Sequence, residues 1–284
     1  MLVVVGDLVE DVVVWTNARP RRGTDTAARI ERRRGGSAAN VAAFAAAAGA
    51  PVRFVGCVGD DAIGRALAAE LATGGVDVRV HHRGRTGTVV VLVEPGGERT
   101  MLPDRAACTA LDDVPDAWVA DATWLHVPAY SLMGEPLAAT VGSMVARARG
   151  RGARLSVDAS SVGALAAYGV DAFRGWLASQ RPDVLLANAD EAELLDLRGG
   201  AARTAALTVV KRGPDPVLVW TGDVSEPVAV PVASVAHVRD TTGAGDAFAA
   251  GLLAALQRGA APVDAVGAGI AWAQRVLGNP GASL

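Results

Sequence analysis

The chain has 284 residues but only two cysteines, Cys57 and Cys108, and a single lysine, Lys211. Two cysteines outside a Cys-x-x-Cys pair cannot build a disulfide framework, which favours a reducing compartment. Met1 leads directly into the apolar residues 2–5 without a basic region. A secretory signal is therefore not expected, and a cytoplasmic location is.

Large aromatic side chains and long apolar runs are also scarce. The sequence has four Phe and two Tyr although 51% of its residues are hydrophobic, so Ala, Val and Leu must build most of the core. The longest apolar run, 41–52, is too short to cross a bilayer. The formal net charge of −3 gives no reason to expect binding to nucleic acid or to a membrane surface.

Short Val- and Leu-rich runs alternate with helical patterns along most of the chain. Continuous apolar strands indicate burial on both faces of a parallel sheet, and strand–helix repetition predicts a doubly wound α/β fold. We expect one domain over residues 1–284, with a mostly parallel sheet flanked by helices. Strands are predicted at 2–5, 53–58, 76–80, 124–127, 154–158 and 184–187, and helices at 37–48, 62–73, 136–149 and 170–178.

Two segments, roughly 9–34 and 81–103, do not follow this pattern. The first has alternating character with an Arg/Gly/Thr-rich middle, and the second has two β-rich runs joined by Glu94-Pro95-Gly96-Gly97. Proline and glycine in that position are typical of a hairpin turn. We expect these segments to form a small β lid over one edge of the sheet, and an exposed lid hairpin is compatible with a homodimer.

The most informative stretch is Asp240-Thr241-Thr242-Gly243-Ala244-Gly245-Asp246, which precedes an alanine-rich helical pattern. A helix start carries unpaired N–H groups and the positive end of the helix dipole, which favour an anion such as phosphate. A carboxylate in such a turn is explained if Asp246 takes a proton from a hydroxyl that attacks phosphorus. An ordinary first-turn acid is the alternative.

A second glycine turn lies at Gly35 and Gly36, followed by Ser37 and Asn40. Bare glycine backbone lets a polyol approach closely, and the Asn40 amide can both donate to and accept from hydroxyls. A simple helix cap at Ser37 is the alternative. Gly35, Gly36 and Asn40 are therefore candidates for binding a polyol, and the family resemblance described next assigns them to the acceptor.

With these two signatures the sequence resembles the ribokinase-like (PfkB) family of carbohydrate kinases. The resemblance implies Asp246 as the base that deprotonates the acceptor, and an anion hole formed by the N–H groups of Gly243, Ala244 and Gly245. It also implies a monovalent cation such as K⁺ at Asp240 and Thr242, and an acid that grips two sugar hydroxyls at Asp11. The family's Asn two residues before that acid is Val9 here.

The resemblance also implies residues that bind the nucleotide and its metal ion. Asn188 and Glu191 match the family's Asn-x-x-Glu motif, which implies that Glu191 organises Mg²⁺ through water. The same two residues can form a helix-capping box, and both interpretations can be true together. Lys211 and Gly213 match the segment that borders ATP, although Pro216 stands where a second glycine is usual. A basic surface turn is the alternative for Lys211. Arg99 and Arg105 are expected to be exposed by default.

Other phosphate-binding enzymes fit the sequence poorly. A dinucleotide-binding Gly-x-Gly turn would need Gly or Ala at Phe248, and Asp246 would repel pyrophosphate. A P-loop is excluded because Arg212 follows the lone lysine. The sequence therefore predicts an ATP- and Mg²⁺-dependent kinase for a hydroxymethyl group of a sugar or sugar-like molecule. A nucleoside kinase of the same fold and a non-catalytic binding relative are the alternatives.

Overall fold

The computed structural model describes residues 1–198, 204–222, 224–235, 237–238, 240–278 and 282. In these residues a nine-stranded sheet has the order β13-β12-β11-β10-β9-β8-β1-β4-β5. The strands from β5 to β11 run parallel, whereas β12 and β13 are antiparallel additions at one edge. The strands are β1 Leu2–Val5, β4 Val52–Val58, β5 Asp77–His82, β8 Trp124–Pro128, β9 Arg154–Asp158, β10 Val184–Asn188, β11 Leu207–Arg212, β12 Asp215–Thr221 and β13 Val228–Val230.

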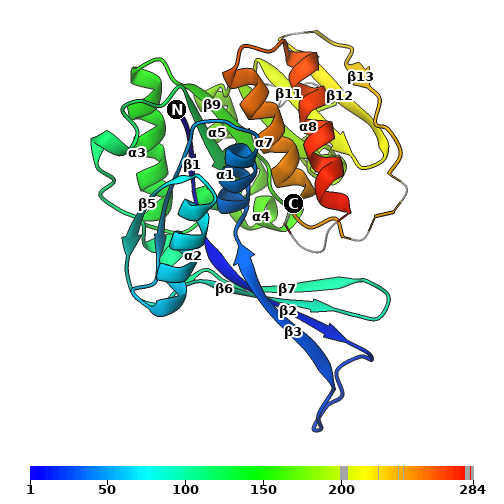
Figure 1. Ribbon diagram of the computed structural model, residues 1–284. Coiled ribbons are helices and arrows are strands. Elements are labelled where there is room, and N and C mark those ends of the chain that lie inside the picture. The colour runs from blue at the N-terminus through cyan, green and yellow to red at the C-terminus, as the bar shows by residue number, and fades with distance from the viewer. Residues whose placement is uncertain (199–203, 223, 236, 239, 279–281, 283–284) are drawn as a thin grey trace.

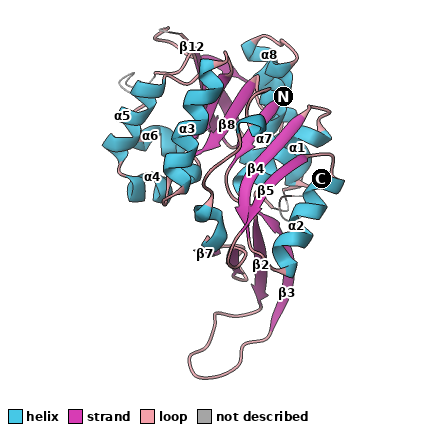
Figure 2. Cartoon of the chain, turned by 90° about the vertical axis from the view of Figure 1, so that its left-hand side faces the viewer, coloured by secondary structure: helices cyan, strands magenta, loops and turns pink. Residues whose placement is uncertain are grey.

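Helices cover both faces of this sheet (Figures 1 and 2). One core contains Leu2 and Val4 of β1 with α1, α2, α7 and α8, and the other contains Val3 and Val5 with α3, α4, α5 and α6. Alternate β1 residues therefore serve opposite cores, as a strand buried on both faces requires. The helices are α1 Ser37–Ala47, α2 Ala62–Thr73, α3 Leu137–Gly150, α4 Val162–Tyr168, α5 Val170–Gln180, α6 Ala189–Leu194, α7 Ala244–Gln257 and α8 Pro262–Leu277, with short 3₁₀ turns η1 Ala106–Ala110, η2 Asp116–Trp118 and η3 Ala129–Leu132.

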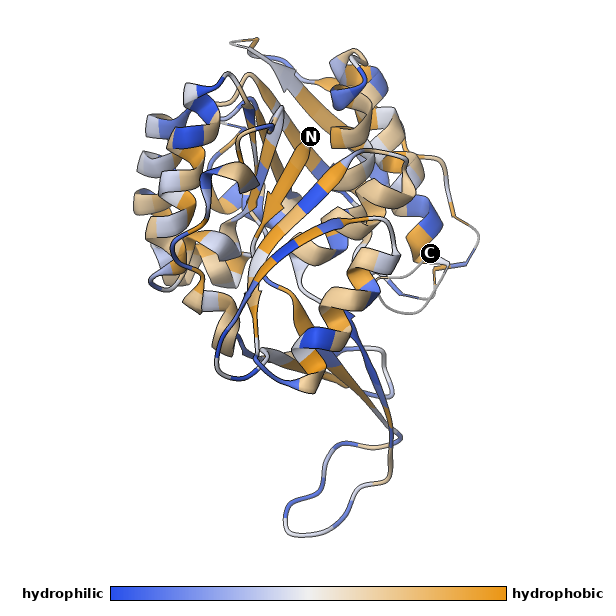
Figure 3. Cartoon of the chain, turned by 60° about the vertical axis from the view of Figure 1, so that its left-hand side comes forward, coloured by the Kyte–Doolittle hydropathy of each residue, from blue (hydrophilic) through white to orange (hydrophobic). Residues whose placement is uncertain are grey.

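A separate four-stranded sheet, the lid, has the order β3-β2-β6-β7. Its strands are β2 Val9–Thr16, β3 Ala28–Gly35, β6 Thr88–Val93 and β7 Arg99–Asp104. The central pair β2–β6 is parallel, and each outer strand is the antiparallel return of a hairpin. The lid projects from the main body below the sheet (Figure 1), and the loop at its tip is hydrophilic where the central strands are hydrophobic (Figure 3).

The predicted fold class is confirmed: a mostly parallel sheet lies between helical layers and carries a small β lid. His81 and His82 belong to β5 of the main sheet, so the second lid segment begins at Thr88. No helix in the described part of the chain has the length and apolar character needed to span a membrane. Because β1 pairs with β4 on one side and β8 on the other, the chain winds outward from β1 in both directions. The carboxyl ends of strands at such a switch point are where ligands bind.

Candidate active site

The first turn of α7 lies at this carboxyl edge and carries Asp246. Gly243 precedes the helix with φ +77°, a left-handed conformation that glycine adopts without strain. A side chain at Gly243 would also meet Ala282 at 2.5 Å. The Ala244 N–H donates to the Thr241 carbonyl at 3.2 Å and closes the turn. The segment thus brings Gly243, Ala244 and Gly245 to a helix N-terminus, as the sequence predicts, and one of the three amides is already used within the turn.

Asp246 is held by two residues of α1. The Ser37 hydroxyl donates to Asp246 Oδ1 at 2.7 Å, and Asn40 Nδ2 donates to Oδ2 at 2.9 Å. Burial raises the pKa of Asp246 to about 6, while these two hydrogen bonds act in the opposite direction. The carboxylate is therefore oriented, is charged at neutral pH, and has a pKa close to the range useful for a general base.

Ser37 does not cap α1, which is one of the two interpretations of this residue from the sequence. The N-cap is Gly36, and no side chain caps the helix. Gly36 has φ +99°, and a Cβ there would lie 2.3 Å from the Asp7 carbonyl oxygen. Gly36 therefore lets the end of the lid strand β3 pack closely against the residues that follow β1. The sequence did not predict the hydrogen bond from Ser37 to Asp246.

Asp11 on β2 lies against Gly35, the last residue of β3. A Cβ on Gly35 would stand 2.1 Å from Asp11 Oδ1, so the carboxylate covers the bare glycine backbone. Burial raises the pKa of Asp11 to about 6; Arg34 opposes this shift, and the charge of Asp246 adds to it. Arg34 Nη1 also donates to Asn40 Oδ1 at 2.9 Å. The predicted acceptor residues thus gather beside Asp246, together with Arg34, to which the sequence analysis assigned no role.

A buried ion pair lies at the ends of β9 and β11. Lys211 Nζ is 2.9 Å from Asp158 Oδ2, and both side chains are mostly buried. Burial acts to lower the pKa of Lys211, but Asp158 and Glu191 outweigh it, so this pKa is raised and the lysine stays protonated. A Cβ on Gly245 would lie 3.6 Å from Lys211 Nζ. Lys211 is therefore not a surface residue: it places a positive charge beside the first turn of α7. Asp158 was not predicted.

Asn188 pairs with Lys211 in the register of β10 and β11. It caps α6 with its side chain, which accepts from the Glu191 N–H at 2.9 Å. The Glu191 carboxylate in turn accepts from the Asn188 N–H at 2.8 Å and from its Nδ2 at 2.7 Å. The capping box predicted from Asn-x-x-Glu is therefore present.

Glu191 lies where a divalent cation would be favourable. Burial and the nearby charge of Asp158 raise the pKa of Glu191 to about 7, with Lys211 opposing them. In the described part of the chain no three His, Cys, Asp or Glu side chains gather to hold a metal by themselves. Mg²⁺ usually keeps several waters and binds through one or two carboxylates plus substrate phosphates. Glu191 fits such an ion through water, as part of a nucleotide–metal complex.

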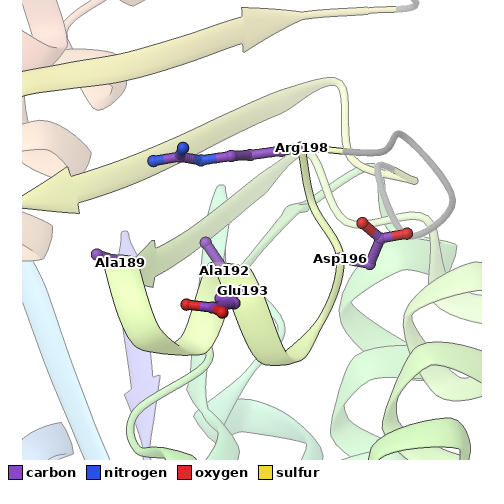
Figure 4. A pocket seen from close by; sticks show the side chains of 5 residues that line it. All are labelled: Ala189, Ala192, Glu193, Asp196 and Arg198. Atoms are coloured by element: carbon purple, nitrogen blue, oxygen red, sulfur yellow. The ribbon is translucent and has the colours of Figure 1, made fainter.

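The predicted glycine loop of the nucleotide side is a tight hairpin between β11 and β12. Gly213 lies in this turn with φ +61°, and Arg212 Nε donates to the Pro216 carbonyl at 2.9 Å. A cavity of about 410 Å³ opens nearby along α6 and the residues that follow it (Figure 4). Ala189, which lines it, directly follows Asn188. Its other lining residues are Ala192, Glu193, Asp196 and Arg198.

Neither Arg99 of the lid nor Arg105, which follows β7, is simply exposed, so the default expectation for both is wrong. Arg105 donates through Nε and Nη2 to the two carboxylate oxygens of Asp7, at 2.7 and 2.8 Å. Arg99 reaches the segment before α7, where it pairs with Asp240 at 2.6 Å and donates to Thr242 Oγ1 at 2.5 Å. The two residues predicted to bind a monovalent cation are thus engaged by a guanidinium.

Comparison with known proteins places this geometry in a family. The sequence profile of the pfkB family of carbohydrate kinases matches residues 1–284. The chain belongs to the pfkB family. It is 34% identical over 272 residues to a fructokinase of Klebsiella pneumoniae, covering 89% of this chain and 83% of that protein. A fructokinase of Salmonella typhimurium is 31% identical over 284 residues, with 92% and 86% covered.

Solved structures of pfkB-like proteins share the fold. Adenosine kinase from Sinorhizobium meliloti superposes with a TM-score of 0.89 at 23% identity, covering all of this chain and 95% of that one. A putative ribokinase II of E. coli, solved with ATP and Mg²⁺, has a TM-score of 0.86 at 22% identity, with 99% and 94% covered. The predictions of the family and of a carbohydrate kinase are confirmed; the roles of individual site residues stay predictions.

Proposed function

We propose that this pfkB-family protein transfers the γ-phosphoryl group of ATP to a hydroxymethyl group of a sugar, with Asp246 as the general base. The observation that carries the proposal is the pair of hydrogen bonds from Ser37 and Asn40 to Asp246, at 2.7 and 2.9 Å. These bonds join the acceptor signature to the anion-binding turn, although the two lie more than two hundred residues apart in the sequence. One carboxylate therefore faces both the acceptor residues and a helix N-terminus.

The acceptor would lie between the lid and the carboxyl edge of the sheet. Asp11 accepts from sugar hydroxyls, and the bare backbone at Gly35 and Gly36 permits close approach. Asp246 removes the proton of the attacking hydroxyl as that oxygen bonds to phosphorus. The bond between phosphorus and the bridging oxygen breaks in line with the attack, and ADP leaves.

Residues around the main sheet would stabilise the negative charge on the phosphoryl group as it is transferred. The N–H groups at the start of α7 and the helix dipole favour the phosphoryl oxygens. Lys211 adds a positive charge beside Gly245, and Asp158 fixes the position of that lysine. Glu191 would hold Mg²⁺ through water, and the ion would neutralise charge on the nucleotide phosphates. K⁺ is not part of this proposal, because Arg99 occupies the side chains expected to bind it.

For the acceptor we propose a ketohexose of the fructose type. Fructokinases from two bacteria are 34% and 31% identical to this chain over most of its length, whereas the adenosine kinase structure, at 23% identity, supports the fold alone. The competing acceptors are ribose, a keto-deoxy sugar acid and a nucleoside. The side chains that extend into the acceptor pocket determine which of them binds.

A panel of these four acceptors in a coupled ADP-release assay tests the function. We expect ATP- and Mg²⁺-dependent ADP release with fructose and much less with adenosine. Thermal shift measured on the same panel separates a kinase from a binding relative. An acceptor that raises the melting temperature and yields no ADP with any nucleotide would contradict the kinase proposal. ADP release with adenosine alone would replace the sugar with a nucleoside.

We also propose that two copies pair through the lid. The lid face opposite Asp11 carries apolar residues on all four strands, beside polar residues such as Glu10 and Arg32, because paired residues point to the same side. Ile30 and Leu102 on this face are 60% and 52% exposed. Exposed apolar patches of this kind typically mark protein contacts. The apolar residues of the face are Val12, Val14, Ile30, Val90, Leu92 and Leu102.

A further inference from the structure

Arg99 connects the lid to the loop that precedes the anion-binding turn. It is the first residue of β7 and stands opposite Val93, at the turn end of the β6–β7 hairpin. Its Nη2 is 2.6 Å from Asp240 Oδ1, and its Nη1 donates to Thr242 Oγ1 at 2.5 Å. Figure 1 shows the hairpin running beneath the segment that leads into α7. Two parts of the chain separated by 143 residues are thus joined by one side chain.

The contact falls on residues that shape the turn itself. Asp240 Oδ1 also accepts from the Thr242 N–H at 2.7 Å, so the same carboxylate oxygen holds the loop backbone and the guanidinium. Thr242 is followed by Gly243, the N-cap of α7. A shift of Asp240 or Thr242 would therefore move the amides of the first turn relative to Asp246.

The family resemblance implies a monovalent cation at Asp240 and Thr242 of this loop. Both are engaged by Arg99, whose side chain is 24% exposed, and the guanidinium already supplies one positive charge. These two side chains do not fit an additional cation while Arg99 is in place. A planar guanidinium also gives two directed hydrogen bonds, which a spherical ion does not.

We propose that Arg99 takes the place of the monovalent cation at this loop. The positive charge that fixes the anion-binding turn then comes from the lid and not from an ion in solution, so the turn acquires its catalytic geometry only when the hairpin lies over it. Arg99 is a positioning residue: it acts through Asp240 and Thr242. The effect on turnover rests on the proposed kinase function, but the effect on the loop does not.

The test compares wild type, Arg99→Ala and Arg99→Lys in KCl and in tetramethylammonium chloride at equal ionic strength. Wild-type turnover should be the same in the two salts. Arg99→Ala should lose turnover by about 10- to 100-fold in tetramethylammonium, as misplacement of a reacting group does. K⁺ or guanidinium ion should restore part of that loss. Arg99→Lys keeps the charge but forms one fewer directed hydrogen bond. Its turnover should therefore lie between those of wild type and Arg99→Ala.

Arg85→Ala is the matched control, because Arg85, which lies before β6, forms an exposed ion pair with Asp104 of β7. It should leave turnover unchanged in both salts. Hydrogen exchange supplies a readout that needs no acceptor: amides of residues 241–246 should exchange faster in Arg99→Ala, slow again with K⁺, and be unaffected in Arg85→Ala. The hydrogen-exchange measurement tests the role of Arg99 even if no acceptor yields ADP. A lack of ADP would count against the proposed kinase function and not against the role of Arg99.

Strong stimulation of the wild type by K⁺ would overturn the proposal, because it would show that an ion still binds beside Arg99. Exchange in residues 241–246 that is the same in wild type and Arg99→Ala would also overturn it. A loss of turnover in Arg99→Ala that neither K⁺ nor guanidinium reduces would assign Arg99 a different role.

Discussion

The main sheet and the lid hold charged groups in different ways. Lys211 and Asp158 stand at the ends of buried parallel strands, and their side chains are 16% and 12% exposed. On the lid, Asp104 pairs with Arg85, and these side chains are 56% and 63% exposed. A buried pair is fixed by the packing around it, whereas an exposed pair contributes little and is easily broken. The core is thus suited to the bond-making step and the lid to selection of the acceptor.

This comparison predicts that changes in the core lower turnover while changes in the lid, apart from Arg99 at the α7 turn, weaken acceptor binding. Lys211→Met should lower kcat by about 100-fold with little change in the acceptor KM, since it removes a charge beside the first turn of α7. Steady-state kinetics in both substrates measures this. Lys211→Arg keeps the charge and should retain more activity. A Lys211→Met variant that raised the acceptor KM and kept kcat would break the comparison.

Asp11 tests the lid side. Asp11→Asn removes the charge that we propose accepts from sugar hydroxyls, so the acceptor KM should rise about 10-fold while kcat changes little. Glu31→Gln is the control, because Glu31 is another lid acid that pairs only with arginines of its own strand in the contacts described. An equal effect of both substitutions would mean that lid charge, and not Asp11, governs acceptor binding.

The pH dependence of kcat tests the role of Asp246. Asp246 must be deprotonated to act as a base, so kcat at saturating acceptor should fall as the pH drops below about 6. Ser37→Ala removes a donor that favours the charged form, which raises the pKa of Asp246 and moves this acid limb to higher pH. Ser143→Ala, on the exposed surface of α3, is the control. An acid limb that did not move in Ser37→Ala would separate Ser37 from the base.

The smallest effect on catalysis is expected at the outer face of the lid. Leu102→Glu should convert a dimer to a monomer in sedimentation, because it buries a charge in the proposed contact, and turnover per chain should stay near wild type. Val224→Glu, at an equally exposed position between β12 and β13 of the main sheet, should not change the sedimentation. A wild-type protein that sediments as a monomer would contradict the dimer.

The sequence was sufficient for features that depend on local pattern. Residues 2–5, 62–73 and 154–158 have the predicted bounds, because apolar runs and helix signals mark them directly. The assembly of Asp11, Gly35 and Asn40 near Asp246 was also expected, from the resemblance to the ribokinase-like family. An acid ending an apolar strand was a signal for Asp158 that could have been used.

Contacts between distant segments could not be predicted in this way. Ser37 and Asp246 are 209 residues apart, and nothing near either residue distinguishes a hydroxyl that binds a carboxylate from one that caps a helix. The pairing of Arg99 with Thr242 likewise depends on where the folded lid lies. In an arginine-rich chain, the sequence alone does not distinguish the arginine that contacts the loop before α7 from the arginines that are exposed.

Replacement of Asp246 tests the central claim most directly. Asp246→Asn should lower kcat by about 10²–10⁴-fold, the usual share of a general base. Acceptor affinity, measured by calorimetry, should stay close to wild type because Asp11 and the glycine backbone are intact. Asp264→Asn, an exposed first-turn aspartate of α8, is the control and should have no effect. Turnover of Asp246→Asn near the wild-type rate would contradict the account.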